Sequence, residues 1–244
     1  MKTCLVLITT CVWFVVSGCD SGADEPTYGG NCFPKMGSTY TYDYYMTDSN
    51  GNNIESSKQE QTATVIGTDM NYMGKSKVFQ VEDNGVSNYY TYETNGDVYI
   101  FLDKNGFGTL STFIGDAFFQ QWYMLPIVSK FKGLIVFDST IKVTVPLLGE
   151  VDVYVEAKIG YVAQEMITVG GQTLTAEKCK LTITGEPQID QLPIPIDLAF
   201  VAEQFISFVP KIGYVGKQTT TTTPPSLLGP PSGDYRILTS YTLK

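Results

Sequence analysis

The chain contains no histidine and a single arginine, Arg236, among its 244 residues. Without histidine it lacks the commonest general base and metal ligand, which excludes Ser-His-Asp and Cys-His catalytic arrangements. A zinc site of the usual type is also excluded, because cysteine is scarce as well. Asp190, Asp197 and the pair Glu150 and Asp152 offer carboxylates, but no spacing marks two of them as the facing pair of a glycosidase. We therefore expect a protein that is not an enzyme and that holds no metal or cofactor.

Basic residues are scarce in general. Lysine and arginine together number 16, against 25 aspartates and glutamates, and the formal net charge is −9 at pH 7. Because contact with phosphates needs clustered lysine and arginine, we expect no nucleic-acid partner. The same net charge predicts that an anionic membrane surface repels the protein.

An apolar run long enough to span a bilayer comfortably, about 20 residues, is also missing from the N-terminus. The run over residues 5–16 follows Lys2 and ends at the small residues Ser17 and Gly18. This layout is typical of an export signal, which we place at residues 1–18. The protein is therefore expected outside the cytoplasm.

The end of this signal, Val16-Ser17-Gly18-Cys19, resembles the lipobox of bacterial lipoproteins. The resemblance implies that Cys19 becomes the mature N-terminus and carries a diacylglycerol and an acyl chain such as palmitate. An ordinary signal followed by a chance cysteine is the alternative, but the polar residues 20–26 favour a tether for an anchored domain. We expect a lipid-anchored protein of the bacterial cell envelope, with a tether at residues 19–31 and one domain at residues 32–244. The membrane and leaflet stay open.

Cys32 and Cys179 are the cysteines that follow Cys19. In an oxidising compartment they predict a disulfide that joins the start of the domain to a distant strand. Two unpaired, buried thiols, which behave as small hydrophobes, are the alternative.

Alternating residue types predict β-strands along most of the domain. In residues 40–46, Tyr40, Tyr42, Tyr44 and Met46 fall on one face. Asn-Gly pairs, which suit type I′ turns, separate the strands of the first half. Residues 48–52 look like the start of a calcium loop but lack its later ligands, so they predict a hairpin turn. The further strands expected in this half are 61–66, 78–82, 87–93 and 98–102.

The second half follows the same pattern, with glycines between the strands. We expect its last strand at residues 235–243, with Tyr235, Ile237, Tyr241 and Leu243 on one face. The threonines at 219–223 favour a strand that pairs with it, because β-branched residues suit strands. The other strands expected here are 140–146, 151–158, 161–168 and 172–184.

Two apolar segments depart from this alternation. Residues 110–122 and 198–209 carry apolar side chains at helical spacing, and Asp197 is a plausible N-cap for the second. Each segment predicts either a short helix that lies across the sheet or an apolar strand, because residues 194–200 also alternate. The segments 107–137 and 190–212 would fill or cover the concave side of the sheet.

Two further motifs resemble a group of uncharacterised bacterial envelope lipoproteins. Residues 33–42, FPKMGSTYTY, resemble their opening element, and residues 209–217, VPKIGYVGK, resemble a late element. The resemblance implies a large, curved antiparallel sheet, a half-barrel or open barrel similar to the lipoprotein carriers LolA and LolB. It implies no catalytic residues.

The expected fold class is therefore mainly β, with one or two short helices or lid segments. The leading hypothesis is that the concave face binds a hydrophobic or amphipathic ligand. An alternative hypothesis is an adhesion or assembly protein that binds a protein or glycan through exposed tyrosines. The aromatic residues expected to line the concave face are Phe113, Phe118, Trp122, Phe200 and Phe205.

Overall fold

The computed structural model describes residues 32–102, 118–145, 149–188, 199–224 and 230–244. These residues form one antiparallel sheet of twelve strands, and the helical element among them is a single 3₁₀ turn, η1 (Glu55–Ser57). No helix in this part of the chain has the length and apolar character needed to cross a bilayer. The strands are β1 (Thr39–Thr47), β2 (Gln59–Tyr72), β3 (Lys75–Asp83), β4 (Val86–Tyr92), β5 (Val98–Leu102), β6 (Gln121–Leu125), β7 (Leu134–Val145), β8 (Gly149–Val169), β9 (Gln172–Pro187), β10 (Phe200–Val209), β11 (Tyr214–Thr223) and β12 (Ser232–Thr242).

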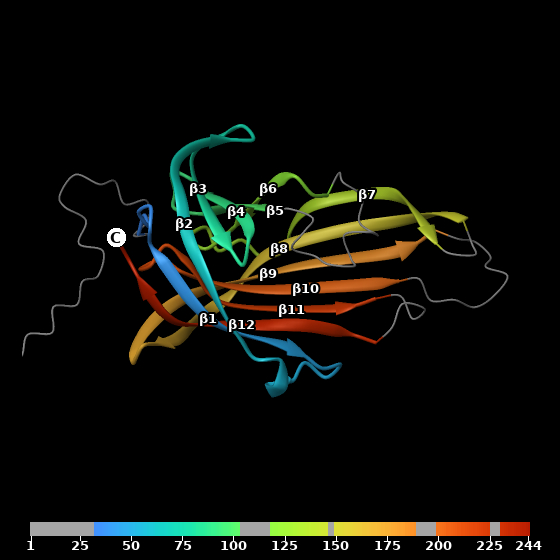
Figure 1. Cartoon of the computed structure of the whole chain (residues 1–244). Coiled ribbons are helices and arrows are strands. Elements are labelled where there is room, and N and C mark those ends of the chain that lie inside the picture. Colours follow the sequence, from blue (N-terminus) through green and yellow to red (C-terminus); the bar gives the residue numbers. More distant parts are fainter. Residues whose placement is uncertain (1–31, 103–117, 146–148, 189–198, 225–229) are drawn as a thin grey trace, which may run out of the picture.

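The two halves of the chain meet in the middle of the sheet. Strand order is β6-β5-β4-β3-β2-β1-β12-β11-β10-β9-β8-β7, so every neighbouring pair except β1 and β12 is consecutive along the chain. Thr39 lies opposite Thr242, and Thr47 lies opposite Gly233. Figure 1 shows that the sheet curls until it nearly closes into a barrel, with β3 to β6 above β8 to β10. The predicted mainly β fold with a large, curved antiparallel sheet is confirmed.

The core fills the inside of this curl because alternate residues of each strand point inward. In β8, Val153, Val155, Ala157 and Ile159 are all buried, while Asp152 and Lys158 are exposed. Residues of both halves share one apolar cluster, which includes Tyr40, Val81, Leu125, Leu181 and Phe208. Burial of each large apolar side chain contributes about 1.5–3 kcal/mol relative to exposure.

The turns follow the expected chemistry. Asn84 and Gly85, between β3 and β4, both have positive φ, 50° and 78°, as a type I′ turn requires. At the first hairpin the Asp48 carboxylate accepts the backbone N–H groups of Asn50 and Asn52, each at 2.9 Å. The predicted hairpin turn at residues 48–52 is confirmed. The five threonines lie in β11, and the first four of them pair with β12, as predicted.

Gly160 does not separate two strands as predicted, because β8 runs through it without a break. A Cβ atom at Gly160 would lie 2.5 Å from the backbone nitrogen of Gly133. The glycine therefore makes room for the connection between β6 and β7, which crosses β8 at this point. Gly160 therefore indicates a close approach of two backbone segments and not a turn.

The two segments with helical spacing contain strands where the structure describes them. Residues 200–209 form β10, in which Phe200, Ala202, Gln204 and Ile206 are buried in strict alternation. Pairing of β10 with both β9 and β11 overrides the helical pattern. Residues 121–125 form β6, whereas residues 110–117 lie outside the described residues.

A β-bulge changes the face assignment in β12. Thr41 lies opposite Ser240, but Tyr42 lies opposite Leu238, so Thr239 has no partner position on β1. One extra residue moves all later side chains to the other face. Tyr235 and Tyr241 therefore lie on opposite faces, and the prediction that they share one is wrong. The residues before the bulge that point inward are Asp234, Arg236 and Leu238.

Candidate functional site

A cavity of about 360 Å³ lies on the inner face of the sheet, between the two halves of the chain. Its walls come from β1 to β5 on one side and from β10 to β12 on the other. Part of the wall is apolar and includes Ile100, Leu102, Ile206 and Val215. The remainder is polar and is formed by Gln61, Asp83, Gln204, Gln218, Asp234 and Arg236, among others.

Arg236 is the centre of the polar wall. Its guanidinium donates to the Asp83 carboxylate through Nη1 and to the Gln218 side-chain oxygen through Nη2, at 2.9 Å in the second case. The two charged side chains are 14% and 8% exposed, so the pair is largely removed from water. The guanidinium also lies 5.0 Å from the ring centroid of Tyr42. Arg236 is thus held by a carboxylate, an amide and an aromatic face.

The surroundings of the cavity keep Arg236 charged and disfavour the charged form of Asp234. Burial lowers the pKa of Arg236, but Asp83, Tyr214 and Tyr42 raise it, and the net result lies above the ordinary value. Arg236 therefore stays charged. Burial raises the pKa of the Asp234 carboxyl, although a hydrogen bond from Thr220 and the charge of Arg236 oppose this.

Five tyrosines form a buried group that reaches the ion pair through Tyr42 and Tyr214. Tyr40 donates to the carbonyl of Ile212 at 3.0 Å, and Tyr42 donates to the carbonyl of Val215 at 2.6 Å. Tyr92 bonds backbone carbonyls in the same way, and Tyr214 interacts with Arg236. Burial raises the pKa of each of these phenols, so all stay neutral and can donate: Tyr40, Tyr42, Tyr90, Tyr92 and Tyr214.

Two buried donors in the cavity wall have no partner among the described residues. They are the hydroxyl of Tyr90 and the Nε of Arg236. A buried polar group without a partner costs about 1–3 kcal/mol, so such groups normally contact water or a ligand. The cavity has room for either, since one water occupies about 30 Å³. An apolar wall with two unpartnered donors suits a ligand that has an apolar part and a hydrogen-bond acceptor.

The aromatic residues predicted to line the concave face do not line this cavity. Phe118 is buried and packs on Phe119 and Phe137, and Phe200 is buried against Gly185. Both belong to the core. Phe113 lies outside the described residues.

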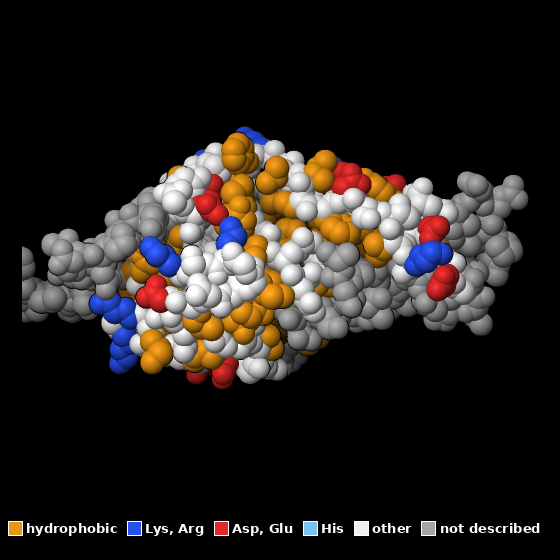
Figure 2. Space-filling view, turned by 90° about the horizontal axis from the view of Figure 1, so that it is seen from above, with side chains coloured by type: hydrophobic (Ala, Val, Ile, Leu, Met, Phe, Trp, Pro, Cys, Tyr) orange, Lys and Arg blue, Asp and Glu red, His pale blue; other side chains and the backbone are white. Residues whose placement is uncertain are grey.

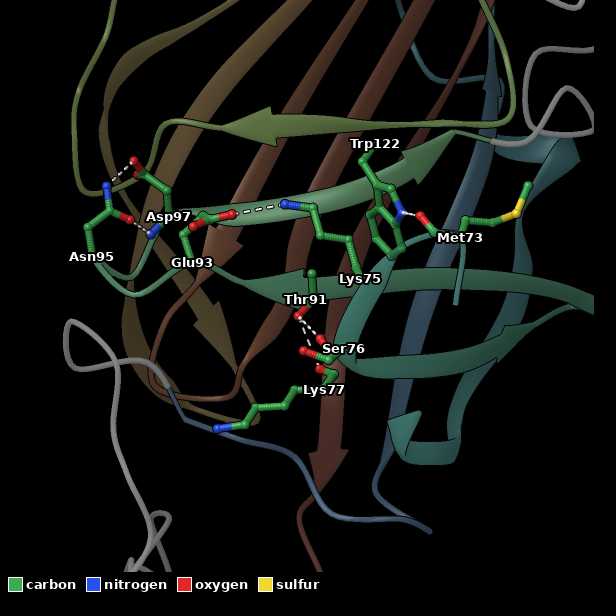
Figure 3. Close-up of polar contacts among 9 residues, drawn as sticks. All are labelled: Met73, Lys75, Ser76, Lys77, Thr91, Glu93, Asn95, Asp97 and Trp122. Carbon is green, nitrogen blue, oxygen red and sulfur yellow. Dashed lines mark hydrogen bonds and ion pairs between the residues drawn. The ribbon is translucent and has the colours of Figure 1, made fainter. Parts of the chain in front are cut away.

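Trp122 and Phe205 lie on the outer face instead. Figure 3 shows Trp122 bent toward the β2–β3 hairpin, where its Nε1 donates to the carbonyl of Met73 at 3.0 Å. Nearby, Tyr72 and Tyr89 stack with their centroids 3.9 Å apart. Phe205 lies under the ammonium group of Lys178, 4.7 Å from the ring centroid. The rings of Trp122, Tyr72 and Tyr89 therefore fix the hairpin onto the sheet.

Cys179 is a free thiol, so the predicted disulfide between Cys32 and Cys179 is wrong. Cys179 lies in β9 opposite Ile206, whereas the backbone N–H of Cys32 donates to Pro210 at 2.6 Å. Four residues of strand separate these points by about 13 Å. A disulfide requires Cα atoms within about 7 Å. Burial raises the pKa of the Cys179 thiol to about 12, which makes it an inert part of the core.

The described residues include no group of three or more His, Cys, Asp or Glu side chains that could hold a metal ion.

The chain is similar in fold to two crystal structures of bacterial proteins. One is a candidate lipoprotein from Parabacteroides distasonis, with 12% identity and a TM-score of 0.45 over 89% of this chain and 100% of that chain. The other is a candidate exported protein with a YmcC-like fold from Bacteroides fragilis, with 10% identity and a TM-score of 0.40 over 87% of this chain and 99% of that chain. No family model matches the chain, and no curated protein matches it either.

Sequence reasoning missed the cavity, although one signal for it was present. Asp234 and Arg236 stand two positions apart in a strand of otherwise uncharged residues. That spacing places both on one face, and the single arginine of a chain is an unusual residue to place there. The sequence alone did not show that this face is the inner one.

Proposed function

We propose that this protein is a non-enzymatic lipoprotein of the bacterial envelope, anchored through Cys19, whose inner cavity binds an amphipathic ligand. The observation that carries the proposal is the pair of donors without a partner among the described residues, Tyr90 and Arg236, in a cavity whose wall is partly apolar. The ligand's acceptor group would bind these two donors. Its apolar part would lie against Ile100, Leu102 and Ile206.

Native mass spectrometry of residues 20–244, purified from a periplasm without detergent, tests ligand binding. We expect extra mass that leaves on denaturation and that lipid analysis identifies as an amphiphile. The change Tyr90→Phe, which removes one donor, should lower the bound fraction about tenfold, as expected for loss of a buried hydrogen bond. Tyr99→Phe is the matched control, because Tyr99 lies opposite Thr91 on the outer face and should leave the bound fraction unchanged. A ligand-free mass in the unchanged protein would contradict the proposal.

Anchoring is tested separately on the full chain. The N-terminal peptide of protein extracted from membranes should begin at Cys19 and carry the mass of the acyl chains. Cys19→Ser should abolish that mass and release the protein from the membrane fraction. An unmodified N-terminal peptide would overturn the anchor and leave the cavity's role to be judged on its own.

The alternative of an adhesion protein with exposed tyrosines has less support. All described tyrosines are buried or half-buried. In the largest outer cluster, the aromatic rings pack against one another, which covers their faces. Aromatic side chains that bind glycans need an accessible ring face.

A further inference from the structure

The described part of the chain begins with Cys32 at one defined end of the sheet. The carbonyl of Cys32 accepts the Tyr92 hydroxyl at 3.0 Å and lies against Gly213, whose φ is +67°. A Cβ at Gly213 would come within 2.2 Å of that carbonyl, so glycine permits this close approach. We call this region the entry end. It consists of residues 32–38, 75–77, 93–97, 126–133, 210–213 and 243–244, which lie at or next to strand ends on the same side of the sheet.

Exposed lysines gather at the entry end. Figure 2 shows lysine side chains near the left side of the molecule, which is the side of the entry end in Figure 1. Lys132 and Lys211 form no ion pair with any residue that the structure describes. The exposed lysines here are Lys35, Lys77, Lys132, Lys211 and Lys244.

The carboxylates of the same end are mostly engaged. Glu93 pairs with Lys75 at 2.9 Å, as Figure 3 shows. Asp97 is fully buried and accepts the backbone N–H groups of Val128 and Ser129 at 2.7 and 3.0 Å. The entry end therefore has a positive surface although the whole chain is acidic.

Apolar side chains are exposed beside these lysines. Met36 is 67% exposed and Phe131 is 55% exposed. Both belong to hydrogen-bonded turns. The N–H of Ser38 donates to the Lys35 carbonyl at 3.0 Å across Met36, and the Phe131 carbonyl accepts the N–H of Tyr161 at 2.7 Å. Cations around exposed Met and Phe are the composition of a surface that rests on lipid headgroups.

The opposite end of the sheet has the reverse charge. Lys142 there faces two carboxylates, those of Glu150 at 3.5 Å and Asp152 at 3.7 Å. Further exposed acidic residues at that end are Glu55, Glu60, Glu82 and Glu186. Among the described residues, the exposed acidic side chains thus lie mainly away from the entry end. The expectation that an anionic membrane repels the protein was drawn from the net charge alone.

We propose that the entry end is a docking face for an anionic lipid bilayer. The lysines would contact the headgroups, and Met36 and Phe131 would enter the boundary between headgroups and acyl chains. The proposal rests on the envelope location proposed above. Charge complementarity supports it, and so does the path of the chain, because Cys19 is about 13 residues before Cys32 and an extended chain of that length reaches at most about 45 Å. A lipid on Cys19 would hold the entry end, and not the acidic end, near the membrane.

Vesicle sedimentation of a chain that begins at Asp20 tests this directly. The chain keeps all twelve strands and carries no lipid, so only its own surface can bind. The probes are phosphatidylcholine vesicles with and without about 30% phosphatidylglycerol, at about 0.1 M salt, where the Debye length is about 10 Å. Each lysine near such a surface should raise the partition coefficient about fivefold. We expect binding to the anionic vesicles only, and its loss at about 1 M salt.

Two matched variants locate the docking face. The double change Lys132→Glu and Lys211→Glu should lower partition at least tenfold. The double change Lys58→Glu and Lys142→Glu alters charge equally at the other end and should change partition less than twofold. Equal losses in both variants, or no binding to anionic vesicles, would overturn the proposal. Neither Cys19 lipidation nor cavity occupancy enters this measurement, so failure here and failure of the proposed function are distinguishable.

Discussion

The ion pair of Arg236 with Asp83 faces the inner cavity, whereas the pairs of Lys142 with Glu150 and Asp152 lie at the acidic end in water. The side chains of the first pair are 14% and 8% exposed, and those of Lys142 and Glu150 are each 68% exposed. Removal of one partner has different consequences in the two places. Inside, it leaves a charge without water or a counter-ion, and outside it leaves a hydrated charge.

The same contrast applies to other groups. The inner face holds the Tyr90 hydroxyl, which has no partner among the described residues, and the Tyr42 hydroxyl, which donates to the Val215 carbonyl. Burial raises the pKa of Asp234 in the cavity, whereas hydrogen bonds from amides lower the pKa of Asp48 at the first hairpin. A polar group that the fold leaves unsatisfied is more informative about ligands than one that it satisfies. This is why the inner face, and not the more strongly charged outer one, carries the ligand proposal.

The largest expected effect is that of Arg236→Met. This change leaves Asp83 buried without a counter-ion and should lower the free energy of unfolding by about 3–5 kcal/mol in urea titration. Lys142→Met should change it by less than about 0.5 kcal/mol, because its pairs are exposed. The double variant Arg236→Met and Asp83→Leu should recover most of the loss. Equal small effects of Arg236→Met and Lys142→Met would show that water reaches Asp83 freely.

A smaller effect separates the two kinds of tyrosine. Tyr42→Phe removes the hydrogen bond to the Val215 carbonyl and should lower the free energy of unfolding by about 1–1.5 kcal/mol. Tyr90→Phe removes a hydroxyl that has no partner and should cost less than about 0.5 kcal/mol in the ligand-free protein. Chemical denaturation of both variants checks this. A large cost for Tyr90→Phe would mean that ordered water already binds that hydroxyl.

The smallest effects concern pH. Burial raises the pKa of Asp234 above 3.8, so its contribution to stability is present at low pH and is lost as the pH rises through the folded-state value. Hydrogen bonds from Asn52 and Asn50 lower the pKa of Asp48, so its contribution is present above 3.8 and is lost as the pH falls through the folded-state value. Asp234→Asn should reduce the change of the unfolding free energy with pH above pH 3.8. Asp48→Asn should reduce that change below pH 3.8. Urea midpoints across this range measure both, and identical profiles for the two variants would contradict the assignment.

Local alternation and turn chemistry were enough to predict the mainly β fold. Residues 98–102 were predicted as a strand with the same bounds as β5. This was possible because a short apolar run between two turn signals is enough to predict a buried strand. Tyr40, Tyr42 and Tyr44 likewise share one face as predicted, and the structure places that face inside. These features depend on neighbours in the sequence.

The cavity depends on distant neighbours and was not predictable in the same way. Arg236 meets Asp83 only because β1 and β12 pair in the observed register and Thr239 bulges. Trp122 and Phe205 were expected inside, since large aromatic residues are usually buried. The registers of β6 and β10 instead place both side chains on the outer face. A shift by one residue exchanges the faces of a strand, and no local pattern fixes that shift across about 200 residues.

The pairing of β1 with β12 also bears on how the protein is made. All other strand pairs can form as hairpins while the chain is still emerging, but this one must wait for residues 232–242. A chain that stopped before Ser232 would keep two meanders, each with a long unpaired edge strand, β1 in one and β11 in the other, and such edges invite aggregation and proteolysis. Only a chain that has been synthesised and exported as far as β12 can pair the edges of both β1 and β11. The last strand therefore distinguishes a complete chain from a truncated one.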